Sequence, residues 1–297
     1  MPIPEAQLEI WSKQGSITQS KETYATIRLA LEDGSAAYAS KSFEIFLQGS
    51  YGNDTNIYAD SDVDVVIKLN STYYSDVTEL SPQDLANYNA AFVAATYEFS
   101  DFRKDVLGQL AERFGSNVTP GNKAILIKGN GARREADVVA AAQFRRYIQF
   151  RSGMSPNYVE GISFWTTDGI QIINYPKLHA DNCTSKHKAT GQWFKPMVRI
   201  LKNVRNTMIS KGYLAEEIAP SYFLEGMLYN VPNSLFGKTY GDTFVNAINW
   251  VNNYTDKPKL LCANEQYYLL HAESPVTWRA EKLQTFLDAT ANFWASY

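Results

Sequence analysis

Hydrophobic and polar positions follow a mixed helix and strand pattern in the first part of the chain. Apolar residues recur with the period of a helix over residues 17–32. Short runs rich in β-branched and aromatic residues predict strands at 43–47 and 63–69. Residues 81–115 open with Ser-Pro, which is typical of a helix start, and continue with a helical pattern.

Two hairpins are predicted next, followed by a change of pattern. Residues 124–128 and 135–141 flank a Gly-Asn-Gly turn, and residues 161–165 and 170–174 flank an Asp-Gly turn. Strand signals then fade beyond residue 177. Helical periodicity dominates the remainder and predicts helices at 192–210, 221–230, 243–253 and 278–296.

These patterns indicate an α+β protein with two parts. We expect residues 1–180 to form a mixed sheet with flanking helices, and residues 181–297 to form a helical domain packed against it. No low-complexity linker separates them. A cleft between two such parts is the expected ligand site.

Composition narrows the class of protein. The hydrophobic fraction of 45% and the charged fraction of 20% are ordinary for a globular protein. Two cysteines, the absence of a signal peptide and the absence of a membrane-spanning apolar run predict a cytoplasmic protein. The net charge of -3 disfavours a long nucleic acid as the main partner, because duplex binders usually carry a basic excess. A small charged ligand remains compatible.

The most informative residues are acidic. Asp62 and Asp64 lie two positions apart at a strand start, so both carboxylates are expected on the same face. Neighbouring anions repel unless a proton or cation intervenes, and Mg²⁺ prefers such hard oxygen ligands. Asp137, flanked by apolar residues in the first hairpin, would join them if its strand lies beside theirs. The alternative interpretation is an ordinary solvated strand end.

A glycine-serine turn precedes this pair. Gln48, Gly49 and Ser50 directly follow the predicted strand 43–47. Glycine lets backbone N–H groups approach an anion closely, and the serine hydroxyl adds a donor. Most Gly-Ser pairs are simple turns, but this one stands between two predicted strands, the second of which opens with Asp-x-Asp.

The combined motif resembles that of polymerase-β-type nucleotidyltransferases. It is most similar to the bacterial CD-NTases, relatives of cyclic GMP–AMP synthase and oligoadenylate synthetase. The motif departs from the usual residues at one position, because Asp54 stands before Thr55 where glycine is common. The resemblance implies a polymerase-β-type core closed by a C-terminal helical domain, with Asp62, Asp64 and Asp137 as catalytic metal ligands.

A second match lies in the helical part. Lys195, Arg199 and Lys202 form a basic stripe on the predicted helix 192–210, which by itself is typical of a solvated cationic face. In the resembled family, a lysine-bearing helix and a Ser-Tyr helix start close the nucleotide pocket. The resemblance therefore implies that Lys202 and Ser221 bind the triphosphate, together with Gln48, Gly49 and Ser50, and that Tyr222 stacks on the base.

The activity that the resemblance implies is Mg²⁺-dependent nucleotidyl transfer, with Mn²⁺ as an alternative cofactor. The substrates are nucleoside triphosphates, pyrophosphate leaves, and the product is a cyclic or linear oligonucleotide second messenger of anti-phage defence. A regulatory protein is a further candidate partner. Two alternatives stay open: transfer to another acceptor (an RNA end, a small molecule or a protein) and a non-catalytic nucleotide-binding homologue.

One further pattern concerns metal binding. His179, Cys183 and His187 are spaced so that a helix would place them on one face, as zinc ligands could be. Proline at 176 and the polar composition argue against a long helix, and no fourth ligand is evident nearby. We therefore interpret the three residues as part of a loop without zinc.

Overall fold

The chain forms two compact units in the computed structural model, which describes residues 2–15, 17–58, 62–272 and 274–297. The α/β unit comprises Ile17–Gln48 and Ser61–Pro176. The helical unit comprises Met1–Ser16, Gly49–Asp60 and Lys177–Tyr297. Two early segments therefore fall in the helical unit, which the pattern of the sequence did not indicate.

A mixed sheet is the centre of the α/β unit. Its strands are β1 (Phe43–Leu47), β2 (Val63–Asp76), β3 (Val118–Pro120), β4 (Ile125–Ile127), β5 (Ala136–Gln149), β6 (Asn157–Trp165) and β7 (Gln171–Asn174). The main path runs β1-β2-β5-β4-β3, and β6 pairs with both β5 and β7. β2 and β5 pair in parallel, whereas β2 is antiparallel to β1 and β5 is antiparallel to β4 and β6.

The central position of β2 explains its composition. Val63, Val65 and Ile67 are fully buried, as expected for a strand that has neighbours on both sides. The predicted strands at 43–47 and 63–69 are confirmed, and β2 continues to Asp76. Both predicted hairpins are also confirmed, as β4/β5 and β6/β7.

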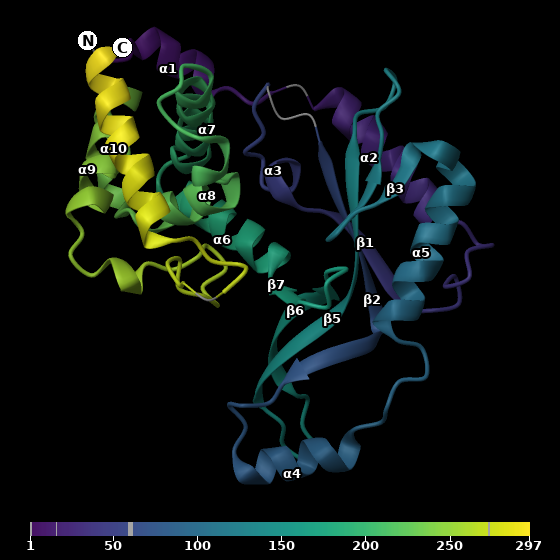
Figure 1. Cartoon of the computed structure of the whole chain (residues 1–297). Helices are drawn as coiled ribbons and strands as arrows, with labels where there is room; N and C mark the ends of the chain where they lie inside the picture. Colours follow the sequence, from purple (N-terminus) through teal and green to yellow (C-terminus); the bar gives the residue numbers. More distant parts are fainter. Residues whose placement is uncertain (1, 16, 59–61, 273) are drawn as a thin grey trace. The chain divides into compact units, whose positions relative to one another are not determined.

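Helices α2 and α5 pack beside this sheet and against each other (Figure 1). The helices of the unit are α2 (Thr18–Leu31), α4 (Pro82–Ala91), α5 (Phe99–Phe114) and the 3-10 turn η1 (Gly115–Asn117). Ile27 of α2 and Phe102 of α5 are fully buried. The predicted N-cap is confirmed, because the Ser81 hydroxyl accepts a hydrogen bond from the Asp84 backbone N–H at 3.2 Å.

The helical unit contains the C-terminal helices and two early segments. Its helices are α1 (Glu5–Ser12), α3 (Gly49–Gly52), α6 (Pro176–Ala189), α7 (Phe194–Ser210), α8 (Ser221–Asn230), α9 (Tyr240–Asn253) and α10 (Ala280–Ser296), with 3-10 turns η2 (Glu216–Ile218), η3 (Asn233–Leu235) and η4 (Lys257–Lys259). Met197, Leu201 and Val204 of α7 lie in its core, and their spacing places them on one face of the helix. Among the described residues, no helix has the length and apolar character needed to cross a bilayer.

The loop interpretation of residues 179–187 is wrong. These residues belong to α6, which begins at Pro176. Proline is favourable at a first helical position, because its N–H would have no intrahelical partner there and its φ angle is already helical. His179 and Cys183 face the interior of the unit, where both are buried.

Candidate active site

Strand pairing brings the predicted carboxylates of the α/β unit together. Asp64 of β2 and Asp137 of β5 are partners in the parallel register, so their side chains leave the same face of the sheet. Asp62 precedes Asp64 by two positions. Burial raises the pKa of Asp137, and the negative charges of Asp62 and Glu135 raise it further. The three predicted carboxylates therefore share one region of the sheet.

Glu135 adds a fourth acidic group that the sequence interpretation did not include. Its charge acts on Asp137, from which it is separated by a single residue. A cluster of carboxylates on neighbouring strands is costly by itself, because the ionised groups repel. A divalent cation with a preference for oxygen ligands relieves that repulsion, so Asp62, Asp64 and Asp137 have the donor chemistry that Mg²⁺ requires.

The glycine-serine turn adopts the backbone conformation that its glycine permits. Gly49 has φ +63°, in the left-handed region, and begins the single-turn helix α3. On its N-terminal side, the Gln48 N–H donates to the Asp64 carbonyl oxygen at 3.0 Å, which joins the end of β1 to β2. Gly49 is exposed and Ser50 is half-buried, so both are accessible to an anion.

Residues 53–55 are tied to this turn by backbone hydrogen bonds. The Asn53 N–H donates to the Gly49 carbonyl at 3.0 Å, and the Thr55 N–H donates to the Ser50 carbonyl at 2.9 Å. Asp54 between them has φ +54°, a conformation that glycine adopts easily and that aspartate tolerates better than most residues. This conformation accounts for the glycine that is common at this position in the resembled motif.

The basic stripe of α7 holds the same segment. Lys195 Nζ lies 3.1 Å from the Asp54 carboxylate, and Arg199 Nη1 donates to the Asp54 carbonyl at 2.7 Å. Lys202 Nζ donates to the Thr55 carbonyl at 3.1 Å. Lys195 and Lys202 are buried, so the interpretation of a solvated cationic face is wrong. The side chains of the stripe contact the loop that follows the glycine-serine turn.

Ser221 and Tyr222 occupy the first turn of α8, after Pro220 as the N-cap. The Ser221 hydroxyl accepts a hydrogen bond from Arg205 Nη1 at 3.2 Å. Arg205 is one helical turn beyond Lys202 on α7. Its guanidinium is a cation next to Ser221, and the sequence interpretation did not include Arg205. Its position three residues after Lys202 was the available signal.

The Tyr222 ring is supported on one side. His179 stacks on it with ring centroids 4.8 Å apart and an interplanar angle of 22°. The phenol oxygen accepts a hydrogen bond from Asn264 Nδ2 at 3.0 Å. Tyr222 is partly buried, so it is a fixed aromatic platform rather than a mobile side chain.

The three residues of the possible zinc pattern, His179, Cys183 and His187, do not form one cluster in the structure. His179 and Cys183 gather with Glu225 of α8, with ligand atoms within 4.8 Å of one another, whereas His187 Nδ1 accepts a hydrogen bond from the Lys195 N–H. Burial raises the pKa of the Cys183 thiol well above its usual range, which disfavours the thiolate that zinc binds. The Glu225 carboxylate already accepts hydrogen bonds from three side chains. These contacts favour a hydrogen-bonded cluster over a metal centre.

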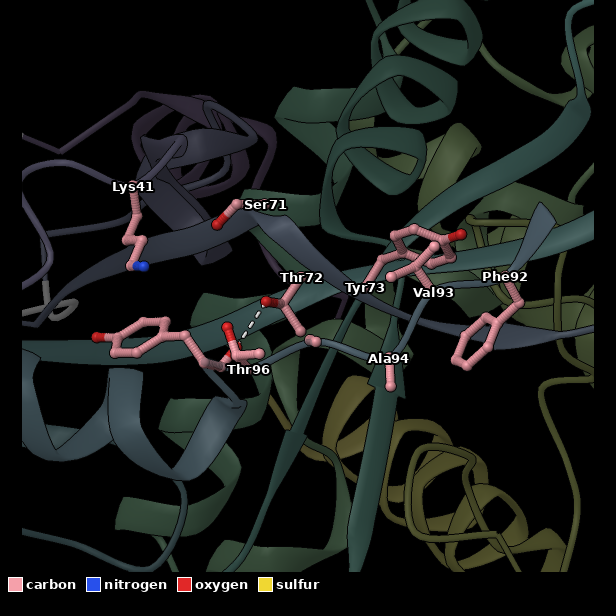
Figure 2. Close-up of a pocket in the computed structure, with 10 residues that line it drawn as sticks. Lys41, Ser71, Thr72, Tyr73, Phe92, Val93, Ala94 and Thr96 are labelled. Atoms are coloured by element: carbon pink, nitrogen blue, oxygen red, sulfur yellow. Dashed lines mark hydrogen bonds between the residues drawn. The ribbon is translucent and has the colours of Figure 1, made fainter.

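A cavity of about 470 Å³ lies elsewhere in the α/β unit (Figure 2). Residues 71–73, residues 92–97 and Lys41 line it. Lys41 Nζ lies 4.8 Å from the centre of the Tyr97 ring, and the Thr72 hydroxyl donates to the Tyr97 carbonyl at 2.7 Å. None of the predicted catalytic or nucleotide-binding residues lines this cavity, so it is not a candidate for the reaction.

Comparison with known proteins gives matches over the whole chain. Residues 181–295 match the family model of the cGAS/DncV-like nucleotidyltransferase C-terminal helical domain. The chain is 40% identical to the cyclic UMP-AMP synthase of Rhodothermus marinus, over 100% of this chain and 99% of that protein. It is 35% identical to the cyclic nucleotide synthase CdnE01 of Staphylococcus haemolyticus, over 99% of each chain.

Solved structures agree with these matches. The Rhodothermus marinus CdnE c-UMP-AMP synthase, solved with Apcpp and Upnpp, has a TM-score of 0.89 at 38% identity and covers 100% of this chain and 98% of its own. The Elizabethkingia meningoseptica CdnE cyclic dinucleotide synthase, solved with GTP and Apcpp, has a TM-score of 0.80 at 29% identity, covering 99% of this chain and 100% of its own.

Proposed function

This chain belongs to the bacterial CD-NTases, which are nucleotidyltransferases that make cyclic nucleotides, and we propose that it joins two nucleoside triphosphates into a cyclic dinucleotide. Family membership confirms the predicted resemblance, the fold class and the nucleotidyltransferase activity. A dinucleotide product is supported by relatives that are named for cyclic dinucleotides and match nearly the whole chain.

The observation that carries the assignment of the catalytic residues is the register of Asp64 with Asp137, with Asp62 two positions before Asp64. In our proposal these carboxylates hold Mg²⁺, or Mn²⁺ in its place. When bound, the metal supplies charge neutralisation at the reacting phosphate and lowers the pKa of the attacking hydroxyl. Asp137 accepts the proton of that ribose hydroxyl.

The reaction then has two equivalent transfers. A ribose hydroxyl oxygen of one nucleotide forms a bond to the α-phosphorus of another, and the bond from that phosphorus to the pyrophosphate oxygen breaks. Repetition of the step on the linear intermediate closes the ring, so two triphosphates give one cyclic dinucleotide and two pyrophosphates. The carboxylates hold and orient the reacting groups without forming a covalent intermediate.

The helical unit is proposed to bind nucleotide. Gly49 and Ser50, next to Gln48, offer backbone and hydroxyl donors to the triphosphate. Lys202 and Ser221 add a positive charge and a hydroxyl. Tyr222 stacks on the base, a contact that is worth about 1–3 kcal/mol in other base-binding sites.

The proposed activity is tested with nucleotides alone. We expect purified protein with Mg²⁺ and a mixture of ATP, UTP, GTP and CTP to form a phosphatase-resistant cyclic dinucleotide, detected by mass spectrometry of the products. ATP and UTP are the first pair to try, because the Rhodothermus marinus relative is a cyclic UMP-AMP synthase. Product that forms only after addition of RNA, a small molecule or a protein would contradict the proposal and indicate transfer to that acceptor.

The cellular role follows from the product. We propose that the cyclic nucleotide acts as a second messenger in anti-phage defence, in keeping with the family, and that a regulatory protein is a further partner. Expression of the active protein and of a catalytically inactive variant in a phage-challenged host tests the defence role. Equal plaque numbers for the two would contradict it.

Lys202 provides a test of the proposed triphosphate ligands. Lys202→Met keeps the length of this buried side chain and removes its charge, so the KM for nucleoside triphosphate is expected to rise about tenfold or more. Lys186→Met is the matched control, because Lys186 Nζ also donates to a backbone carbonyl, that of Val231, in the same unit. Lys186→Met should keep the wild-type KM in steady-state assays. If Lys202→Met keeps it as well, Lys202 has no part in binding the triphosphate.

A further inference from the structure

Glu225 is a buried carboxylate without an assigned part in the reaction. Only 3% of its surface is exposed. It accepts hydrogen bonds from the Thr55 hydroxyl at 2.5 Å, Asn53 Nδ2 at 2.9 Å and His179 Nε2 at 2.6 Å. Burial alone would raise its pKa, but His179 and Thr55 together with the charge of Lys202 lower the pKa below its usual value. The group is therefore ionised and held by three donors.

Stability alone does not account for such a group. Removing a carboxylate from water costs several kcal/mol, and apolar replacements of buried ion pairs are often neutral or stabilising. A buried charge whose hydrogen bonds are all satisfied can instead fix one arrangement of the groups that bind it. Two of the donors to Glu225, Asn53 and Thr55, belong to the loop that follows the glycine-serine turn.

That loop transmits the position of Glu225 to the turn. The backbone N–H groups of Asn53 and Thr55 donate to the carbonyls of Gly49 and Ser50. Each residue thus holds α3 with its main chain and Glu225 with its side chain. A displacement of Glu225 would therefore move the turn that carries the proposed phosphate donors.

His179 connects the same carboxylate to the aromatic platform. Its Nε2 atom binds Glu225, and its ring stacks on Tyr222 at 4.8 Å. The imidazole is buried, with 2% of its surface exposed. The His179 side chain therefore contacts both Glu225, which holds the proposed phosphate-binding turn, and Tyr222, the proposed base-stacking ring.

We infer that Glu225 and His179 are positioning residues that fix the glycine-serine turn and the Tyr222 ring relative to each other, so that one nucleotide can contact both. The inference rests on the proposed function, because that function assigns Ser50 to the triphosphate and Tyr222 to the base. Neither Glu225 nor His179 needs to touch the substrate. Their contribution is a preformed spacing between the two contacts, which lowers the entropy lost on binding.

Thr55→Val tests the hydrogen bond between Thr55 and Glu225 with little change in side-chain volume. It removes the hydroxyl donor to Glu225 and leaves the backbone hydrogen bond to Ser50 in place. We expect binding of a non-hydrolysable ATP analogue, measured by calorimetry, to weaken about tenfold, which is ~1.4 kcal/mol. The KM should rise in parallel. Thr290→Val is the matched control: Thr290 is equally buried in α10 and donates only to its own helix, at Phe286.

Glu225→Met completes the test as a double-variant cycle, because methionine keeps the length of the side chain and removes both oxygens that accept hydrogen bonds. If Thr55 acts through Glu225, the variant with both substitutions should bind the analogue no more weakly than Glu225→Met alone, because the shared contact is lost only once. Additive losses, or a wild-type affinity in Thr55→Val with only a lower melting temperature, would overturn the inference. The Thr55→Val result stands by itself if Glu225→Met fails to fold.

His179→Gln separates the two contacts of the imidazole. Glutamine can keep an N–H donor to Glu225 but has no ring to support Tyr222. We expect weaker binding of the ATP analogue and unchanged binding of inorganic triphosphate, whereas Thr55→Val should weaken both. Equal losses for both ligands in His179→Gln would overturn the assigned role of its ring.

These measurements distinguish the inference from the proposed function. A wild-type protein that binds the analogue but forms no cyclic product would contradict the function, and the binding comparison among variants would still decide the positioning roles. A wild-type protein that binds no nucleotide would contradict both the proposed function and the positioning roles of Glu225 and His179.

Discussion

Replacing Asp62 and Asp64 together with asparagine is expected to reduce formation of the cyclic product by ~10³-fold or more. Asparagine keeps the size of each side chain but removes the two negative charges that would hold the divalent cation. The protein should stay folded, because Asp62 is exposed and Asp64 lies at the start of β2 rather than in its buried centre. Product is measured with radiolabelled triphosphates, and folding by circular dichroism.

A control variant with the same change in net charge is available in the helical unit. Asp181→Asn combined with Asp288→Asn alters two helix residues remote in sequence from the motif and should keep wild-type activity. Addition of Mg²⁺ with nucleotide should raise the melting temperature of the wild type and of this control, but not of the Asp62/Asp64 variant. Full activity after loss of both aspartates would refute the proposed mechanism.

Asp137→Asn is expected to lower activity by about 10²–10⁴-fold and, in the same protein, to raise thermal stability without metal. The loss of activity follows from loss of the proton acceptor. The gain in stability follows from the raised pKa of Asp137, whose main cause is burial, followed by the charges of Asp62 and Glu135. A carboxyl with a raised pKa in the folded state favours folding while protonated, and this contribution is lost as pH rises through the folded-state pKa.

Above its folded-state pKa the ionised Asp137 therefore costs free energy of folding, and the uncharged asparagine does not. Melting temperatures in the presence of a chelator, for wild type and variant at neutral pH, measure this difference. A variant that is less stable than the wild type and still forms product at the wild-type rate would show that Asp137 is a packing residue. The combination of higher stability and lost activity is the signature of a catalytic charge.

Local patterns were sufficient for most of the secondary structure. The alternation of side chains along an extended strand predicted that Asp62 and Asp64 share a face, because that alternation is a property of any such strand. In the structure β2 begins at Val63, one residue after Asp62. The common face of Met197, Leu201 and Val204 in α7 likewise follows from helix geometry alone. The Gly-Asn-Gly and Asp-Gly turns predicted two hairpins, since those dipeptides favour the required backbone angles.

The errors arose where local preference and tertiary packing disagree. Residues 176–189 have few apolar side chains and begin with proline, so their own pattern argued against a helix. Burial of His179 and Cys183 in the helical unit stabilises α6 nevertheless. Lysines at helical spacing indicated a solvated face for α7, because nothing in the local sequence shows that residues 53–55 contact them.

Residue types and short-range spacing thus singled out the acidic pair and the glycine-serine turn as candidates, because their chemistry and local geometry are properties of neighbouring residues. The lysine and tyrosine of the helical part were predicted only from the resemblance to the CD-NTases. Pairing of Asp64 with Asp137 and enclosure of Glu225 by Asn53, Thr55 and His179 depend on contacts between segments far apart in the chain. Such contacts are selected by the packing of the whole unit, so only the folded structure could assign them.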